Sequence, residues 1–308
     1  MKLNVAVPRL WLNLRVRQCS WVVFFRIFFT LTLAIYSQIL PGAPAIGQFE
    51  VKHLEVESGK WEFQSQNAFS FGNPSRKTFL QNGNTVNDDN NIVKQRHALE
   101  IERGFGTRFR CRLGIEFEKT LSGGGDSSSQ SLSNYADGLE FEETAIEIVY
   151  VLVPPKGRAM GIGLLVEGQK AVDDDEGDSV VFHLLLQGKR GIYRYLLNTG
   201  FIKHYGIEDK KTDFSYAAQG IRGFGNELEI GWEIYGTLDR ISSGQKEVLG
   251  RSIFGDYHQH RAGPVVYSRA RLPFVGSEEL LKIGFGFFMG LNSNTPDQTL
   301  KSSIEYDF

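Results

Sequence analysis

Apolar and polar residues alternate along most of this chain from Trp61 onward, with a period of two. The stretch RFRCRLGIEFEK, residues 108–119, places Phe109, Leu113 and Phe117 on one face and charged residues on the other. The same alternation recurs in residues 60–71, 226–234 and 280–289. Because successive side chains of a β-strand point to opposite sides, this period predicts strands with one apolar face.

The connections between these strands alternate between short and long. Tight turns are expected at GFG (104–106), PPKG (154–157), GKRG (188–191) and GFG (223–225), and longer polar segments such as residues 120–138 separate them. An outer-membrane barrel has short turns at one end and long loops at the other, whereas a soluble sandwich requires no such alternation. We therefore predict an all-β fold, a transmembrane antiparallel up-and-down β-barrel of about twelve strands, over residues 61–308. A shift of phase near Glu143 indicates a bulge.

The composition is compatible with this fold and argues against a nucleic-acid-binding protein and a helical membrane protein. The chain has 308 residues, a net charge of -2 and 41% hydrophobic residues. Such a balance gives no indication of a nucleic-acid partner. The part of the chain after residue 45 lacks the roughly 20 consecutive apolar residues of a spanning helix. A spanning barrel can be this polar, because half of each strand faces its interior.

Residues 1–45 have the order of a secretory signal peptide. Basic residues precede an apolar stretch that Arg26 interrupts, and PGAPA follows with small residues at Ala43 and Ala45. We expect cleavage near Ala45, with an uncleaved N-terminal anchor as the alternative. Residues 46–60 would then be a periplasmic lead or one extra strand. Of the two cysteines, Cys19 lies in the signal peptide, so Cys111 alone remains and we expect no disulfide, metal or other cofactor.

The end of the chain, TLKSSIEYDF, alternates in the same way and finishes on an aromatic residue. It resembles the closing strand of Gram-negative outer-membrane β-barrel proteins, in which this strand is the signal for the barrel-insertion machinery. The resemblance extends loosely to uncharacterised proteobacterial barrels labelled as transporters. It implies a location in the bacterial outer membrane, in contact with lipid and lipopolysaccharide. The matching residues are Leu300, Ile304, Tyr306 and Phe308.

If the apolar faces meet lipid, the charged faces must line the interior, because an Arg or Lys at the lipid-facing midplane costs about 2 to 4 kcal/mol. Parity then predicts a basic ladder that faces carboxylates inside the barrel. We interpret it as the lining of a channel or transporter that passes a small polar or anionic solute. The residues concerned are Arg108, Arg110, Arg112, Glu100, Glu102, Glu116, Glu147, Glu229 and Glu233.

Two other functions remain open. A barrel of about twelve strands permits only a narrow pore, and mutually satisfied ion pairs could plug it, which would leave a structural or adhesive role. An outer-membrane lipid hydrolase would need a serine and a histidine within hydrogen-bond reach. His258 and His260 share a strand face beside a serine-rich loop, but no nucleophile motif accompanies them. We therefore do not expect an enzyme.

Overall fold

The computed structural model describes residues 49–72, 77–81, 84–88, 93–120, 139–157, 159–172, 178–205, 212–225, 227–238, 259–271, 280–292 and 295–308. The expected signal peptide and its cleavage near Ala45 lie outside these ranges. No helix among the described residues is long and apolar enough to cross a membrane.

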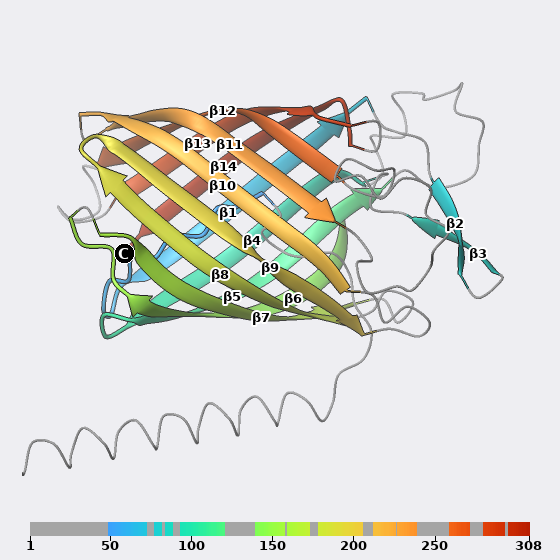
Figure 1. Ribbon diagram of the computed structural model, residues 1–308, viewed down its shortest axis with the longest axis horizontal. Coiled ribbons are helices and arrows are strands. Elements are labelled where there is room, and N and C mark those ends of the chain that lie inside the picture. The colour runs from blue at the N-terminus through green and yellow to red at the C-terminus, as the bar shows by residue number, and fades with distance from the viewer. Residues whose placement is uncertain are drawn as a thin grey trace, which may run out of the picture. The chain divides into compact units, whose positions relative to one another are not determined.

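Twelve antiparallel strands form a closed barrel, as the period of two predicts (Figure 1). Each strand pairs with its neighbours in the chain, and β1 closes the ring by pairing with β14. The closing strand is also joined to β1 at its end, where the Phe308 amide donates to the Trp61 carbonyl over 2.9 Å. The barrel strands are β1 (Trp61–Phe71), β4 (Val93–Phe105), β5 (Phe109–Thr120), β6 (Glu140–Val153), β7 (Gly161–Ala171), β8 (Asp178–Arg190), β9 (Tyr193–Tyr205), β10 (Thr212–Phe224), β11 (Leu228–Leu238), β12 (Gln259–Arg271), β13 (Leu280–Gly290) and β14 (Gln298–Asp307).

A separate two-stranded sheet lies in the connection between β1 and β4. Its strands are β2 (Lys77–Gln81) and β3 (Asn84–Asp88), which pair with each other and not with the barrel. The polar composition of this connection gives no sign of the hairpin, because its strands are only five residues long.

The short connections are where the sequence places them. The hairpins β4–β5 and β10–β11 both turn at the repeated RGFG, and the second glycine of each, Gly106 and Gly225, has a φ of 61° and 68°. This left-handed conformation is accessible to glycine at little steric cost. The two repeats are therefore equivalent turns.

The predicted bulge is present in β6. Glu116 of β5 lies opposite Glu143, but the next residue, Phe117, lies opposite Phe141, so β6 contains one extra residue at this point. The extra residue restores the phase, and β6 presents apolar residues outward on both sides of the bulge.

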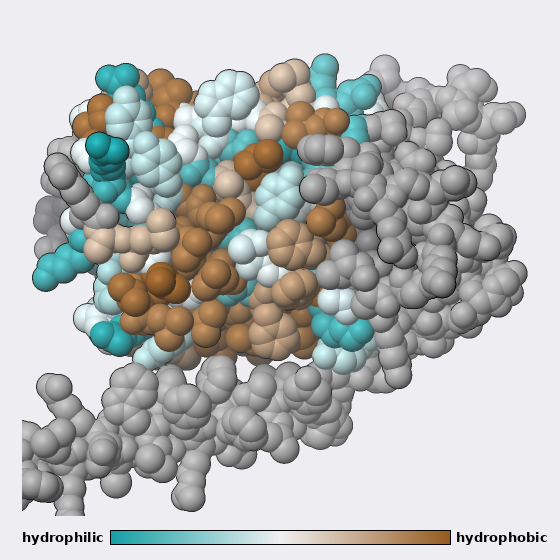
Figure 2. Space-filling model, viewed as in Figure 1, coloured by the Kyte–Doolittle hydropathy of each residue, from teal (hydrophilic) through white to brown (hydrophobic). Residues whose placement is uncertain are grey.

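Large apolar side chains cover the outer face of the barrel. Trp232 is 60% exposed and Phe285 58%, although both belong to regular strands. Figure 2 shows brown, hydrophobic side chains gathered across the middle of the visible face. Exposed apolar area of this extent is not usual for a surface in water. The alternate residues of the same strands are buried in the interior, and many of them are charged or polar.

Candidate functional site in the barrel interior

The predicted ladder forms a buried ion-pair cluster on β4, β5 and β6. Arg112 lies 2.9 Å from Glu100 and 2.9 Å from Glu102, and Arg110 lies 3.4 Å from Glu102. Glu147 of β6 completes the group, 3.9 Å from Arg112. None of these five residues is more than 7% exposed. The structure therefore brings together the arginines and carboxylates that parity placed in the interior.

The remaining predicted carboxylates belong to other ion-pair groups inside the barrel. Glu116 pairs with Arg96 of β4 at 3.4 Å. Glu229 pairs with Arg194 of β9 at 3.1 Å and with Arg269 of β12 at 3.3 Å. These charges line different parts of the wall.

Glu233 lies in a fourth group, on the opposite side of the ring from β5. Its carboxylate accepts a hydrogen bond from Lys301 of β14 at 3.0 Å and others from Gln219 and the hydroxyl groups of Tyr235 and Tyr267. All five residues are buried. The predicted residue is thus the centre of a network that sequence analysis did not assemble.

The expectation for Arg108 is wrong. Arg108 is exposed and lies in the turn between β4 and β5, because β5 begins at Phe109. The alternation of RFRCR was extended one residue too far, into a turn where parity no longer determines which way a side chain points.

An element that sequence analysis did not recognise runs through the barrel. Residues 49–58, which we call the luminal segment, lie inside the ring of strands and belong to no named strand. The periplasmic lead and the extra strand expected for residues 46–60 are both incorrect for this described part. Val51 packs against one wall and Leu54 against another, so the segment crosses the interior.

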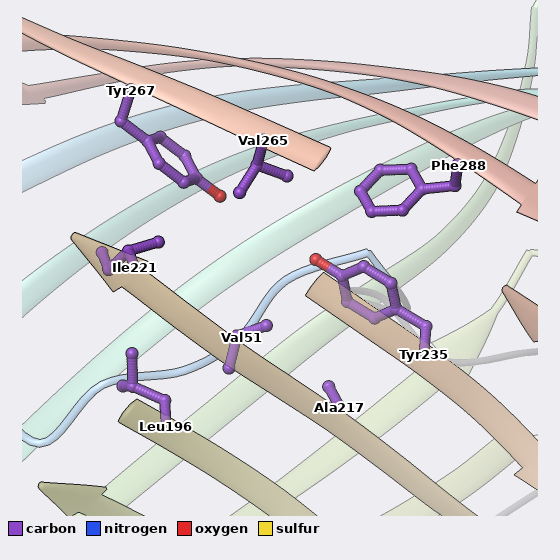
Figure 3. Packing of buried hydrophobic residues seen from close by; sticks show 8 residues of the cluster. All are labelled: Val51, Leu196, Ala217, Ile221, Tyr235, Val265, Tyr267 and Phe288. Carbon is purple, nitrogen blue, oxygen red and sulfur yellow. The ribbon is translucent and has the colours of Figure 1, made fainter. Parts of the chain in front are cut away.

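Figure 3 shows Val51 together with seven buried residues of the wall that form an apolar cluster with it. Its side chain lies among residues from β9 to β13, including Tyr235 and Phe288. Leu54, which is 2% exposed, packs instead against Val149, Leu165 and other residues from β6 to β9. Apolar side chains at these interior positions would face water in an open pore, and the luminal segment covers them.

Side-chain amides of the wall bind the backbone of the luminal segment. Asn198 of β9 accepts a hydrogen bond from the Lys52 N–H at 2.6 Å and donates one to the Lys52 carbonyl at 2.9 Å. Gln187 of β8 accepts from the Leu54 N–H at 2.6 Å and donates to the Glu55 carboxylate at 3.0 Å. Backbone groups that leave water are therefore compensated.

Charged residues of the luminal segment join the ion-pair cluster. The Lys52 ammonium lies 2.7 Å from Glu147 and 3.6 Å from Glu100, and Glu50 lies 2.7 Å from Arg112. Burial and Arg112 act to lower the pKa of Lys52, but Glu100, Glu147 and Glu50 outweigh them and raise it. Lys52 is therefore held charged between carboxylates.

Glycines of the wall leave room for the luminal segment. A Cβ atom at Gly163 of β7 would collide with the Leu54 side chain, and one at Gly104 of β4 would collide with the Glu57 carbonyl. At these positions the interior is shaped to the segment.

Space remains beside the luminal segment. A cavity of about 240 Å³ lies between it and the wall, lined by residues that include Glu50, His53, Glu62, Lys282, Lys301 and Glu305. The Nδ1 atom of His53 accepts a hydrogen bond from Arg110 at 3.3 Å. His53 therefore contacts both this cavity and the ion-pair cluster.

The histidines considered for catalysis do not form a serine pair in the described residues. His258 lies outside them. His260 is buried, with its Nδ1 atom 2.9 Å from the Tyr216 hydroxyl. A different pair, His183 and Ser215, lies at 2.7 Å, but it faces the interior and no carboxylate pairs with His183 in the described part of the chain. No group of His, Cys, Asp and Glu that could hold a metal occurs among the described residues.

Three of the residues matched to the insertion signal, Leu300, Ile304 and Tyr306, lie on β14, and Phe308 directly follows this strand. Leu300 and Ile304 are 44% and 46% exposed on the outer face. The rings of Tyr306 and Phe308 are stacked with centroids 5.5 Å apart. Their role in recognition stays a prediction.

Comparisons with known proteins describe the fold. No family model matches the sequence, and no curated protein matches it. Among solved structures, the NanC porin has a TM-score of 0.47 and 7% identity, covering 80% of this chain and 98% of its own. The KdgM porin has a TM-score of 0.44 and 8% identity over 80% and 98%, and Omp33 of Acinetobacter baumannii has 0.34 and 9% over 83% and 99%. At these values the likeness is one of barrel fold alone, so function is argued below from the residues of this chain.

Proposed function

We propose that this protein is an outer-membrane β-barrel channel that passes a small polar solute when the luminal segment leaves its interior. The observation that carries the proposal is the buried cluster of Glu100, Glu102, Arg110, Arg112 and Glu147, which lines the inside of a closed ring of strands. Fixed charges of both signs at a constriction orient and select polar solutes.

The outer face supports the membrane location. Its exposed apolar side chains are compatible with hydrocarbon, and its strands of 10 to 14 residues are long enough to cross a bilayer at a tilt. The partners that follow are outer-membrane lipid and lipopolysaccharide on the outside, and the barrel-insertion machinery during assembly.

The charge balance of the cluster revises the expected solute. Three carboxylates, those of Glu100, Glu102 and Glu147, face the guanidinium groups of Arg110 and Arg112. The arginines are already paired, so they do not present free positive charge to an anion. We propose an uncharged or cationic solute in place of an anionic one.

The luminal segment supports a gated channel over a permanently open one. It fills the part of the interior where the charges converge, and Val51 and Leu54 join apolar clusters on adjacent parts of the wall, from β9 to β13 and from β6 to β9. Removal of residues 1–45, as the sequence predicts, would place a free chain end a few residues before Phe49. A segment held at one end only can leave without unfolding the barrel.

Planar-bilayer conductance tests this proposal. The chain from Ile46 onward is compared with a variant of the same length, Lys52→Glu with Leu54→Asp, which places like charge beside Glu147 and a carboxylate in the apolar contact of Leu54. We expect small conductance from the first protein and a several-fold larger, cation-preferring conductance from the second. Glu57→Ser, at an exposed position of the same segment, is the control and should behave as the unaltered chain. Absence of conductance from both folded proteins would reject the channel.

A further inference from the structure

We infer that the wall of the barrel interior carries a binding site for an extended peptide with a cationic residue next to aliphatic ones, and that the luminal segment occupies this site as an internal ligand. The inference deepens the proposed function and rests on it, because it names an oligopeptide as the substrate class of the same interior.

Side chains of the wall bind peptide backbone. Asn198 both accepts from the N–H and donates to the carbonyl of one residue, Lys52, at 2.6 and 2.9 Å. A carboxamide has one acceptor and donors in the geometry that matches the donor and acceptor of a peptide unit. Gln187 accepts from the N–H of Leu54, two residues further along, at 2.6 Å. The carboxamides of Asn198 and Gln187 therefore bind backbone N–H and C=O groups, which every extended peptide has.

The wall also has separate places for particular side chains. Val51 belongs to an apolar cluster that includes Leu196, Ile221 and Phe288, and Leu54 belongs to another that includes Leu165 and Leu185. Gly163 supplies the space for Leu54. These contacts lie on different walls, as extended chain requires when it crosses an enclosed space.

The wall is electrostatically complementary to a cationic side chain. Between the two apolar contacts, Lys52 points at Glu147 (2.7 Å) and Glu100 (3.6 Å), and both carboxylates are buried. Glu50 on the other side of Val51 pairs with Arg112 at 2.7 Å. The site is therefore complementary to an aliphatic residue, a cationic residue after it, and a second aliphatic residue two positions further on.

The luminal segment is held as a ligand and not as part of the sheet. Among the described residues, its only ladder-type contact is the isolated bridge of Ser58 with Gly104, at the end where it joins β1. The rest of its binding comes from side chains of the wall. When the segment leaves, the amides and apolar groups that are shaped for a peptide face the water of the interior, and covering the apolar groups again is favourable. A second peptide can satisfy them.

The test adds this peptide in trans to the full chain. A labelled synthetic peptide of residues 46–58, IGQFEVKHLEVES, is titrated against the chain from Ile46 onward and against its Lys52→Glu, Leu54→Asp variant, and fluorescence anisotropy measures binding. We expect saturable binding to the variant and at least about tenfold weaker binding to the unaltered chain, whose own segment competes at high effective concentration. The milder pair Lys52→Ala with Leu54→Ala serves if the first variant does not fold.

Two controls establish specificity. A scrambled peptide of the same composition should bind at least about tenfold more weakly. Introducing Asn198→Leu into the variant should weaken binding of the true peptide by about five- to 100-fold, since it removes two backbone hydrogen bonds. Equal binding of the scrambled peptide, or no saturable binding to either folded variant, would overturn the inference. Conductance without peptide binding rejects the peptide site alone, whereas peptide binding without conductance rejects the channel and leaves the site.

Discussion

Lys52 of the luminal segment forms a buried ion pair with Glu147 of β6 at 2.7 Å, and the pair joins a segment that precedes the barrel to the middle of its wall. The segment carries a cation to a place where the wall has more carboxylates than arginines. The pair thus connects the closure of the interior with the charges that would select a solute. Substitutions that break the Lys52–Glu147 pair should therefore open the interior while most of the charged wall stays in place.

Glu147→Gln should loosen the luminal segment. Removal of one partner of a buried ion pair typically costs about 3 to 5 kcal/mol, because the remaining charge is left without compensation. Here the segment can leave, which places Lys52 in water, so we expect increased conductance and faster proteolysis before β1 while the barrel stays folded. Glu140→Gln, at an exposed end of β6, is the matched control. Unchanged conductance and proteolysis in Glu147→Gln would show that the pair does not hold the segment.

Gly163→Leu should displace the luminal segment by steric exclusion. A Cβ atom at this position already overlaps the Leu54 side chain, and a full leucine would occupy its place. Gly168→Leu in the same strand is the control, because nothing lies within 4 Å of the Cβ position at Gly168. We expect the first variant alone to gain conductance. An equal effect of both substitutions would attribute it to the strand and not to the segment.

Acidification should favour release of the luminal segment through His53. Burial and then the nearby charge of Arg110, with smaller effects of Lys282, Arg194 and Arg112, hold the pKa of His53 well below its usual value. The stabilisation from neutral His53 is therefore complete above about pH 6.5, its pKa in the released segment, and is lost as the pH falls toward the lowered value. Conductance of the full chain should rise as the pH falls below about 6.

The comparison for this prediction is His53→Gln, which keeps a polar side chain that does not titrate. Carboxylates of the interior titrate in both proteins, so the difference between the two pH profiles belongs to His53. Identical conductance–pH profiles of the two proteins would show that His53 does not control release of the luminal segment.

Leu113→Arg tests the orientation of β5. Leu113 is 52% exposed on the outer face between the buried residues Arg112 and Gly114. If that face meets hydrocarbon, the substitution should lower the free energy of unfolding in lipid vesicles by about 2 to 4 kcal/mol. Thr107→Arg in the exposed turn before β5 should change it little. Equal and small effects would place the outer face in water.

The barrel could be predicted from the sequence because strand alternation and turn residues are local signals. The extra residue in β6 near Glu143 is visible as a break in the alternation, and the RGFG turns are visible as glycines between two strands. Parity then assigns Arg110 and Arg112 to the interior. It fails at Arg108, because parity ends where the strand ends.

The luminal segment could not be predicted from the same signals. The position of the luminal segment is fixed by contacts with residues distant in the chain, such as Asn198 and Glu147. No local periodicity of the sequence encodes these contacts. Two features of the sequence are consistent with a filled interior. Val51 and Leu54 are three residues apart, which breaks the period of two. Apolar residues such as Leu165 and Leu185 occupy interior positions that would face water in an open pore. Together they indicate that something apolar fills the interior, but they do not say what.

Amide hydrogen exchange of residues 49–58 tests the central claim most directly. The N–H groups of Lys52 and Leu54 are hydrogen-bonded to buried amides of the wall, so in the folded chain from Ile46 onward they should exchange at least about a hundredfold more slowly than in the free peptide, and Gly163→Leu should abolish most of this protection. Exchange of the segment at the rate of the free peptide, in a barrel whose strands are protected, would contradict the claim that it lies bound in the interior.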